Sequence, residues 1–186
     1  MKKVFFLLGE LDDDDIDWMI STGRREEVVA GTVLIQEGQA IDTLHILLEG
    51  TLSVSVAALE GKTIARLTSG AVVGEMSFAD ARPASATVQA VENSLVLSIR
   101  RADLIDKLQK DEGFASRFYR AIAIFLSTRL RGTVRYLGYA KGQLLNEDSS
   151  AEDLSPEMID NVPLAKARFD WLLRRLKSSD YAALPE

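Results

Sequence analysis

The feature that most constrains the fold is a long run, from Glu26 to Arg100, in which apolar side chains recur at every second position. An apolar period of two is typical of β-strands that bury one face, and glycines between such runs mark turns. Glycines interrupt the run at Gly31, Gly38, Gly50, Gly61, Gly70 and Gly74. Short strands separated by glycine turns predict an all-β sandwich or barrel.

The alternation places about eight strands. They are expected at Glu26 to Val29, Val33 to Gln36, Thr43 to Glu49, Thr51 to Ala57, Thr63 to Leu67, Ala71 to Val73, Thr87 to Ala90 and Leu95 to Ile99. In the fourth, Leu52, Val54 and Val56 should face the core while the hydroxyl side chains face outward. Glu49-Gly50 and Glu60-Gly61 are the expected tight turns, because glycine adopts a positive φ at little cost.

After Ile99 the apolar period becomes helical. It predicts one amphipathic helix over Ala102 to Lys110 and a second, long helix over Phe114 to Leu137. The apolar stripe of the long helix comprises Phe114, Phe118, Ile122, Phe125, Leu126, Leu130, Val134 and Leu137. A stripe of this width needs a cover, so it should pack on the barrel, on a second copy of the chain, or on both.

An acidic run precedes the strands, with aspartates at 12–15 and 17, followed by Met19 and Ile20. Aspartates at the start of a helix cap its free amides and meet the positive end of its dipole. The run therefore predicts a helix over residues 11–22 that ends at Gly23. A calcium site is the minor alternative, since the alternating ligands and glycine of an EF-hand loop are missing.

The C-terminal part differs in composition from the rest. Residues 141–155 are polar and acidic without an apolar period, which predicts a linker or loop. A helical piece beginning at Ser155-Pro156 follows, and then an amphipathic helix that carries Leu164, Trp171 and Leu176 and could begin at Pro163. We expect Trp171 to dock on the body or on a partner.

Charge and composition limit the classes of function. Residues 141–186 hold six Lys and Arg against nine Asp and Glu, a net charge of -3, so a DNA-reading domain with a basic face is not expected. Arg168, Arg174, Arg175 and Lys177 are instead expected on a solvated face opposite Leu172 and Leu176. No apolar run reaches the length of a membrane span, and Val4 to Leu8 is too short for a signal peptide. A cytoplasmic location is the expectation.

Catalytic and metal chemistry find little support in the sequence. The chain has no cysteine and one histidine, His45, amid the apolar residues of a predicted strand. A single strand histidine favours a core or edge position over a metal site, and no serine has the context of a nucleophile elbow. We therefore expect a protein that is not an enzyme and needs no cofactor.

Three blocks of sequence, in order, carry a resemblance. They are residues 30–38 (Ala-Gly-Thr-Val-Leu-Ile-Gln-Glu-Gly), residues 47–50 (Leu-Leu-Glu-Gly), and residues 74–78 (Gly-Glu-Met-Ser-Phe) with 82–88 (Arg-Pro-Ala-Ser-Ala-Thr-Val). From about Leu11 to Val134 the chain resembles the cyclic nucleotide-binding domain of catabolite-activator proteins, kinase regulatory subunits and gated channels. The resemblance implies an antiparallel jelly roll with an N-terminal helix, and C-terminal helices that form a lid and often a dimer contact. We expect this domain at residues 1–140 and an acidic linker with a helical extension at residues 141–186.

The resemblance also implies a phosphate-binding cassette. Its candidate residues are Gly74, Glu75, Met76, Ser77, Arg82, Pro83, Ala84, Ser85, Ala86 and Thr87. The turn at Gly74 would open a short helix whose amides hold a cyclic phosphate, and Glu75 would accept a hydrogen bond from the ribose 2′-hydroxyl. For Glu75 the alternative is a carboxylate that neutralises the local helix end. For Ser85, contact with the ligand and simple packing are equal alternatives.

One position departs from the family pattern. Nucleotide-binding members have an arginine directly after the proline, where this chain has Ala84. A charge-assisted hydrogen bond contributes roughly 1.5 to 3 kcal/mol, so its loss could weaken binding by about one to two decades or more. Arg82 precedes the proline and is the candidate to replace that arginine in part. Both a retained site and a degenerate or retuned pocket stay open.

The expected function is a bacterial-type regulatory module that senses a cyclic nucleotide, cAMP or cGMP, or a related small phosphate ligand and signals through its C-terminal helices. A homodimer through the long helix from Phe114 to Leu137 and an unknown protein partner are expected, with neither DNA nor membrane as partner. The alternative is a degenerate domain that does not bind nucleotide and acts as a dimerisation or docking scaffold.

Overall fold

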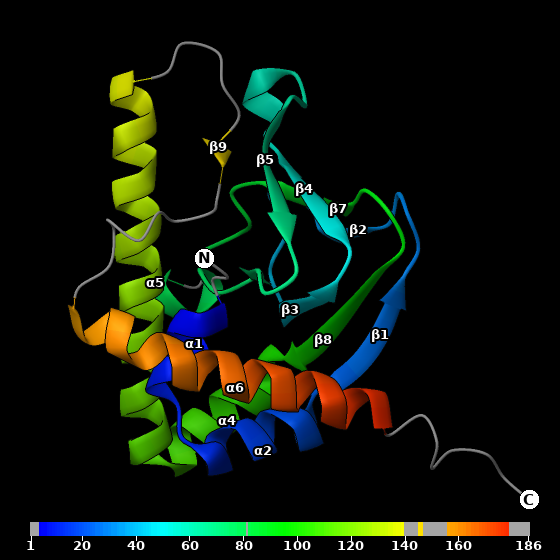
Figure 1. Cartoon of the computed structure of the whole chain (residues 1–186). Helices are drawn as coiled ribbons and strands as arrows, with labels where there is room; N and C mark the ends of the chain where they lie inside the picture. The colour runs from blue at the N-terminus through cyan, green and yellow to red at the C-terminus, as the bar shows by residue number, and fades with distance from the viewer. Residues whose placement is uncertain (1–3, 81, 140–144, 147–155, 179–186) are drawn as a thin grey trace, which may run out of the picture.

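Two β-sheets face each other and a group of helices covers one of them (Figure 1). The computed structural model describes residues 4–80, 82–139, 145–146 and 156–178. The strands are β1 (Arg24–Val28), β2 (Val33–Ile35), β3 (Thr43–Glu49), β4 (Thr51–Ser55), β5 (Thr63–Thr68), β6 (Val72–Val73), β7 (Thr87–Ala90), β8 (Ser94–Arg100) and β9 (Leu145–Asn146). The helices are α1 (Val4–Glu10), α2 (Asp13–Thr22), α3 (Ser77–Asp80), α4 (Arg101–Lys110), α5 (Glu112–Tyr139) and α6 (Pro156–Ser178), with a 3-10 turn at Ala57–Leu59.

The sheets follow a jelly-roll arrangement. One has the strand order β1-β8-β3-β6 and the other β2-β7-β4-β5-β9, and β1 to β8 pair with one another only in antiparallel fashion. This confirms the predicted fold of about eight antiparallel strands with flanking helices. The predicted strand limits agree with the structure to within two residues at each end, because the period of two identifies each buried face directly.

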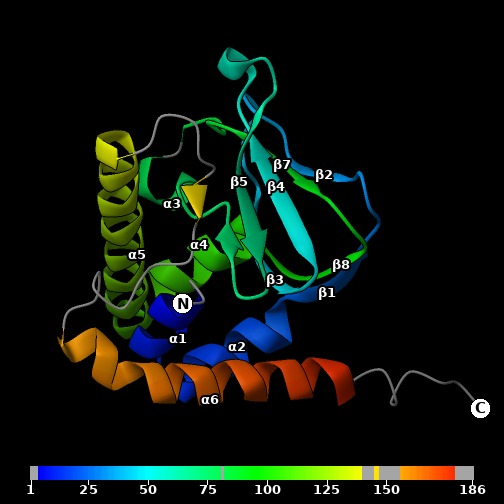
Figure 2. The ribbon, with the colours of Figure 1, turned by 45° about the horizontal axis from the view of Figure 1, so that its top comes forward.

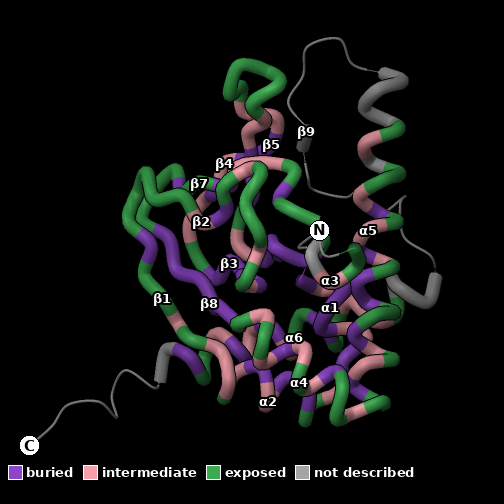
Figure 3. The backbone as a smooth tube through the Cα atoms, turned by 180° about the vertical axis from the view of Figure 1, so that it is seen from behind, coloured by how far each residue is buried: buried purple, intermediate pink, exposed green. Residues whose placement is uncertain are grey.

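The central strands of the first sheet, β3 and β8, are buried on both faces, whereas the edge strand β1 is largely exposed (Figure 3). In β3, Leu44, Ile46 and Leu48 pack against the helices, whereas Leu47 points into the space between the sheets. Alternate residues of β8 divide in the same way. The helices therefore rest on a sheet that also closes the barrel, and the two apolar cores share β3 and β8.

The acidic run begins α2 as predicted. Asp12 and Asp15 form a capping box, in which each carboxylate accepts from the other residue's backbone N–H, at 2.9 and 3.0 Å. Arg117 of α5 then pairs with both carboxylates. Burial of the Asp15 carboxyl favours its neutral form and by itself would raise its pKa. The hydrogen bonds from the Arg117 side chain and from the backbone N–H of Asp12 outweigh this effect of burial and lower the pKa of Asp15. The run thus caps one helix and anchors another.

The C-terminal helix folds back across α1 and α2 (Figure 2). It is one continuous helix from Pro156 to Ser178, with Pro163 inside it, which corrects the prediction of two helical pieces. Its residues Ala165, Phe169, Leu172 and Leu176 are buried in the same core as α1 and α5. Burial of this apolar face stabilises α6, which explains why the helix continues through Pro163 although a proline ordinarily ends a helix.

Two arginines of α6 hold it in place. Arg168 donates to the carbonyl oxygens of Leu8 and Leu11, at 2.9 and 2.6 Å, and pairs with Asp13. Arg175 pairs with Asp17 at 3.2 Å. Since Arg168 satisfies carbonyls at the end of α1, the prediction that it lies on a solvated face is wrong. The predicted docking of Trp171 on the body is confirmed, because its half-buried ring packs against the core.

Two further elements differ from the predictions. Val4 to Glu10 form a helix that is almost wholly buried between α5 and α6, although so short an apolar run gave no helical period. Leu145 and Asn146 form a two-residue strand that pairs in parallel with Ala65 and Arg66 of β5, within the segment predicted as a loop. The rest of that predicted linker lies outside the described residues. No helix in the described ranges has the length and apolar character to cross a membrane.

His45 is a core residue, as predicted. Its ring is buried between the sheets, and Nδ1 lies 2.9 Å from the hydroxyl of Ser98. Ser98 gives its single proton to Glu26 at 2.7 Å, so Nδ1 of His45 must be the donor to Ser98. Burial lowers the pKa of His45, against the opposite influence of Glu26 and Asp42. A neutral histidine thus completes a chain of hydrogen bonds across β3, β8 and β1.

A pH-dependent loss of stability follows from this histidine. Below about pH 6.5, His45 becomes protonated in the unfolded chain but stays neutral in the folded chain, because burial lowers its pKa there. The free energy of unfolding should therefore fall as the pH drops from about 6.5 to the lowered pKa of the folded state. Urea denaturation between pH 7.5 and 5.5 measures this loss. His45→Gln, which keeps an amide donor and does not titrate, should show a weaker pH dependence. Equal slopes for both proteins would refute this role of His45.

Candidate functional site

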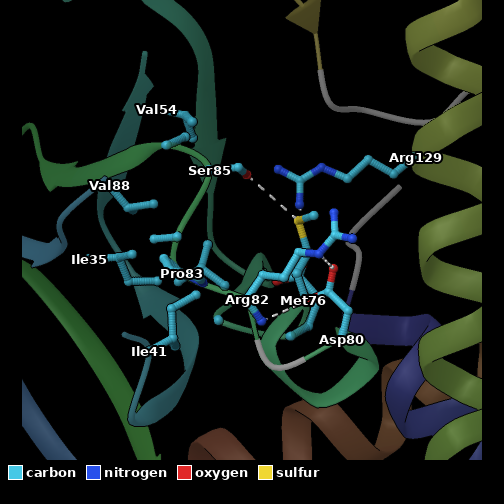
Figure 4. A pocket seen from close by; sticks show the side chains of 15 residues that line it. Ile35, Ile41, Val54, Met76, Asp80, Arg82, Pro83, Ser85, Val88 and Arg129 are labelled. Carbon is cyan, nitrogen blue, oxygen red and sulfur yellow. Dashed lines mark hydrogen bonds and ion pairs between the residues drawn. The ribbon is translucent and has the colours of Figure 1, made fainter. Parts of the chain in front are cut away.

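A pocket opens between the ends of the two sheets, the loop after β6 and the helix α5 (Figure 4). Its inner wall is apolar and its charged side chains come from the loop and from α5. The lining residues are Ile35, Ile41, Val54, Val73, Gly74, Glu75, Met76, Asp80, Arg82, Pro83, Ala84, Ser85, Ala86, Val88 and Arg129. Apolar walls with a few convergent polar groups are typical of a small-molecule site.

The backbone of the loop is held closely against β3. Gly74 has φ +90°, and a Cβ at this position would collide with the carbonyl oxygen of Thr43. Only glycine fits both the conformation and the space. The following helix, α3, has four residues, and the N–H groups of Phe78, Ala79 and Asp80 donate to carbonyls of the same loop. These three amides are therefore not directed at a ligand.

Glu75 lines the pocket and lies beside α5. Its side chain is 2% exposed, and its Oε1 accepts from Nη1 of Arg129 at 2.7 Å. The Arg129 side chain, 30% exposed, extends from α5 toward the pocket (Figure 4). This ion pair joins the loop after β6 to the long helix.

A second contact joins the same loop to α5. The ring of Phe78 meets the buried ring of Phe118 edge to face, with the centroids 5.7 Å apart. Phe118 and Arg129 are eleven residues apart, which is about three helical turns, so both lie on the same face of α5. One face of the long helix is thus attached to the loop through an aromatic pair and through an ion pair.

Arg82 lies at the mouth of the pocket and is directed toward Asp80 (Figure 4). Its Nε lies 3.6 Å from the Asp80 carboxylate, and its side chain is 82% exposed. Ala84 is buried, and its backbone exchanges hydrogen bonds of 2.8 Å with Gly38 and Gln39. The position without an arginine is therefore fixed in place by the turn at 38–39.

Residues 25–111 match the family model of the cyclic nucleotide-binding domain. The chain carries a cyclic nucleotide-binding domain. The match includes all of β1 except Arg24, the strands β2 to β8 and the whole loop from Gly74 to Thr87, and it ends before α5 begins. Arg129 and the C-terminal helices therefore lie outside the matched region.

Solved structures share this fold, and curated relatives match most of the chain. A cyclic nucleotide-binding domain from Methylobacillus flagellatus has a TM-score of 0.65 at 22% identity, covering 76% of this chain and 85% of that one. The N-terminal domain of a transcriptional regulator from Streptomyces coelicolor has a TM-score of 0.58 at 25% identity, covering 74% and 95%. Uncharacterized NTE family proteins of Mycobacterium bovis and Mycobacterium tuberculosis are 28% identical over 157 residues, 84% of this chain. The chain spans 26% of the length of these curated relatives.

The cyclic nucleotide-binding domain brings most of the predicted site residues around one cavity. Gly74, Glu75, Met76, Arg82, Pro83, Ala84, Ser85 and Ala86 line the pocket. Thr87 does not line it, because its hydroxyl accepts from Gln36 and from the backbone of Glu37. Ser77 begins α3, and its side chain lies outside the described residues. Their roles toward a ligand stay predictions.

Sequence reasoning missed Arg129, which lines the pocket from α5. It also did not name as part of the site the lining residues Ile35, Ile41, Val54, Val73, Asp80 and Val88. A signal for Arg129 exists, because it stands four residues after Phe125 and seven after Ile122, both buried. An arginine on the buried face of a helix needs a carboxylate partner nearby. The partner, Glu75, is 54 residues away in the sequence, and periodicity gives no information about such a distance.

Proposed function

We propose that this protein is a regulatory module that binds a cyclic mononucleotide, or a related small phosphate ligand, and transmits occupancy of the pocket to α5. The observation that carries the proposal is the ion pair between the buried Glu75 in the pocket and the partly exposed Arg129 on α5. A ligand that approaches Glu75 must rearrange a contact that also holds the long helix. Ligand binding and the position of α5 are then linked, because the closed ion pair favours one arrangement of α5 and the opened ion pair favours another.

The outward face of α5 offers a surface through which such a change could be transmitted. Of the predicted apolar stripe, Phe114, Phe118, Ile122 and Phe125 are buried in the chain's own core. On another face, Tyr119, Leu130 and Val134 are 49%, 64% and 60% exposed. We propose that this second face, over the predicted span from Phe114 to Leu137, pairs with a second copy of the chain in a homodimer. Regulatory output to a protein partner would follow from the geometry of that pair.

The alternative function is a scaffold that binds no nucleotide. It is favoured by Ala84 in place of the arginine, and by the exposure of Arg82 and its contact with Asp80. In that case the barrel would serve only to hold α5 and its dimer surface in position.

A ligand panel distinguishes the two functions. Differential scanning fluorimetry with cAMP, cGMP and cyclic dinucleotides, at constant ionic strength, should show a rise in melting temperature with a cyclic mononucleotide. A ligand at one hundred times its Kd stabilises the folded state by about 2.7 kcal/mol. The 5′-monophosphates are the matched controls, and light scattering gives the mass in each condition. A stable dimer that responds to none of the nucleotides would support the scaffold.

A further inference from the structure

We infer that the docking of α6 is coupled to the position of α5 through one peptide group, which joins Leu11 and Asp12 at the corner between α1 and α2. The inference rests on the proposed function, in which occupancy of the pocket moves α5, and it names the helix that responds to that movement. The family model matches residues 25–111 and therefore includes neither α5 nor α6. The coupling is a property of this chain's own C-terminal helices.

The carbonyl end of this peptide group is held by α6. Nη1 of Arg168 donates to the carbonyl oxygen of Leu11 at 2.6 Å and to that of Leu8 at 2.9 Å. Nε of the same guanidinium donates to the Asp13 carboxylate at 2.8 Å, and the Arg168 side chain is 14% exposed. Carbonyl groups at the end of a helix have no partner within it and carry partial negative charge, so a cation binds them well. Arg168 thus fixes α6 to the corner.

The N–H end of the same peptide group is held by α5. The N–H of Asp12 donates to the Asp15 carboxylate at 3.0 Å. The guanidinium of Arg117 donates to both oxygens of that carboxylate, at 2.6 and 2.9 Å, and also contacts the Asp12 carboxylate at 2.9 Å. Because Asp15 is 2% exposed, its charge needs the compensation that Arg117 provides. The place of Arg117 on α5 therefore sets the place of the Asp15 carboxylate.

Arg117 stands next to the residue of α5 that contacts the pocket loop. The ring of Phe118 packs edge to face on the ring of Phe78, with the centroids 5.7 Å apart. Phe78 belongs to α3 in the loop after β6. One turn of α5 thus contacts the loop through Phe118 and the start of α2 through Arg117. A shift of the loop that displaces this turn also displaces Arg117.

The geometry of the peptide group carries the displacement to α6. A peptide group is planar, so its carbonyl oxygen and its N–H turn together. When Arg117 moves, the Asp15 carboxylate follows, and the peptide between Leu11 and Asp12 turns with it. The carbonyl oxygen then loses its alignment with Arg168, and a hydrogen bond weakens steeply when it is misaligned. Arg168 therefore docks best at one position of α5.

The remaining contacts of α6 respond less to such a turn. Phe169 and Leu172 are buried in the shared core, and apolar burial has no preferred direction. The ion pair of Arg175 with Asp17 joins side chains that are 55% and 47% exposed, so water weakens it. These contacts keep α6 on the surface of α1 and α2, whereas Arg168 supplies the contact that depends on orientation.

Hydrogen exchange of the full chain without ligand tests the coupling, measured by mass spectrometry on peptides from α6, β3 and β8. Arg117→Gln should increase the opening of α6 by about fivefold or more, the lower end of usual coupling between sites, and that of the strands by less. Arg131→Gln removes an exposed arginine from the same helix and should leave α6 unchanged. If Arg117→Gln fails to fold, Arg117→Lys replaces it, because lysine keeps the charge but lacks the planar fork that holds both carboxylate oxygens.

A double-mutant cycle distinguishes coupling from two independent losses. Arg168→Gln alone should also increase the opening of α6, and Arg174→Gln, at an exposed position of α6, is its matched control. In Arg117→Gln/Arg168→Gln the two increases should not multiply, since either change breaks the same chain of hydrogen bonds. Increases that multiply, or an effect of Arg117→Gln that is equal in α6 and in the strands, would overturn the inference.

The same exchange measurement with cAMP and with cGMP keeps the inference apart from the proposed function. If neither nucleotide binds while the cycle shows coupling, cyclic nucleotide binding is wrong and the coupling of α5 to α6 stands. If a nucleotide binds while the two substitutions act independently, the proposed function stands and the coupling through the corner is wrong.

Discussion

Phe169→Ala should lower the free energy of unfolding of the whole domain by about 3 to 5 kcal/mol, the usual cost of removing a buried phenylalanine ring. Phe169 is 1% exposed and packs edge to face on Phe5, with ring centroids 6.2 Å apart. It stands on α6, beyond the segment that matches the family model. A loss of this size would mean that α6 belongs to the core of the domain.

Urea denaturation followed by circular dichroism measures the effect, and Leu164→Ala on the same helix is the control. Leu164 is 48% exposed, so its truncation should change stability by less than about 0.5 kcal/mol. If Phe169→Ala unfolds at the same urea concentration as Leu164→Ala, α6 is an appendage that does not stabilise the barrel.

Gly74→Ala should destabilise the protein by roughly 2 to 5 kcal/mol and abolish the response to ligand. Two costs add at this position. The positive φ of +90° is unfavourable for alanine, and the added Cβ would collide with the Thr43 carbonyl oxygen. The loop must then move away from β3, and Glu75 moves with it.

Gly61→Ala separates the two costs of Gly74→Ala. Gly61 has φ +72°, but a Cβ there would meet no atom within 4 Å. Its substitution should cost roughly 1 to 2 kcal/mol and leave ligand binding intact. Thermal denaturation and calorimetry on both variants provide the comparison. Similar losses for both would mean that close packing at Gly74 does not shape the pocket.

The barrel could be predicted because its signals are local. Strands β3 and β7 begin and end at the predicted residues, since alternation and turn glycines lie within each segment. The loop from Gly74 to Thr87 could be placed by its resemblance to one family. Eight of its ten candidate residues meet around one pocket, because the loop supplies most of the wall by itself.

The long-range pairs that give the site its character could not be predicted in this way. The pairing of Glu75 with Arg129 and the docking of Arg168 on the end of α1 connect residues 54 and about 160 positions apart. The packing of α5 and α6 decides which partner each of these charged side chains contacts. The apolar period of the sequence carries no information about that packing. The buried helix α1 was missed for a related reason, since its burial comes from α5 and α6 on both sides. The predicted division at residue 140 stays a prediction.

Calorimetric titration of the protein with cAMP and with cGMP tests the central claim most directly. The account predicts saturable binding of one of them, with one site per chain, and a clear loss of affinity in Glu75→Gln, measured at a temperature at which circular dichroism shows the variant to be folded. The absence of binding heat for both nucleotides at millimolar concentration, with a folded protein, would contradict it.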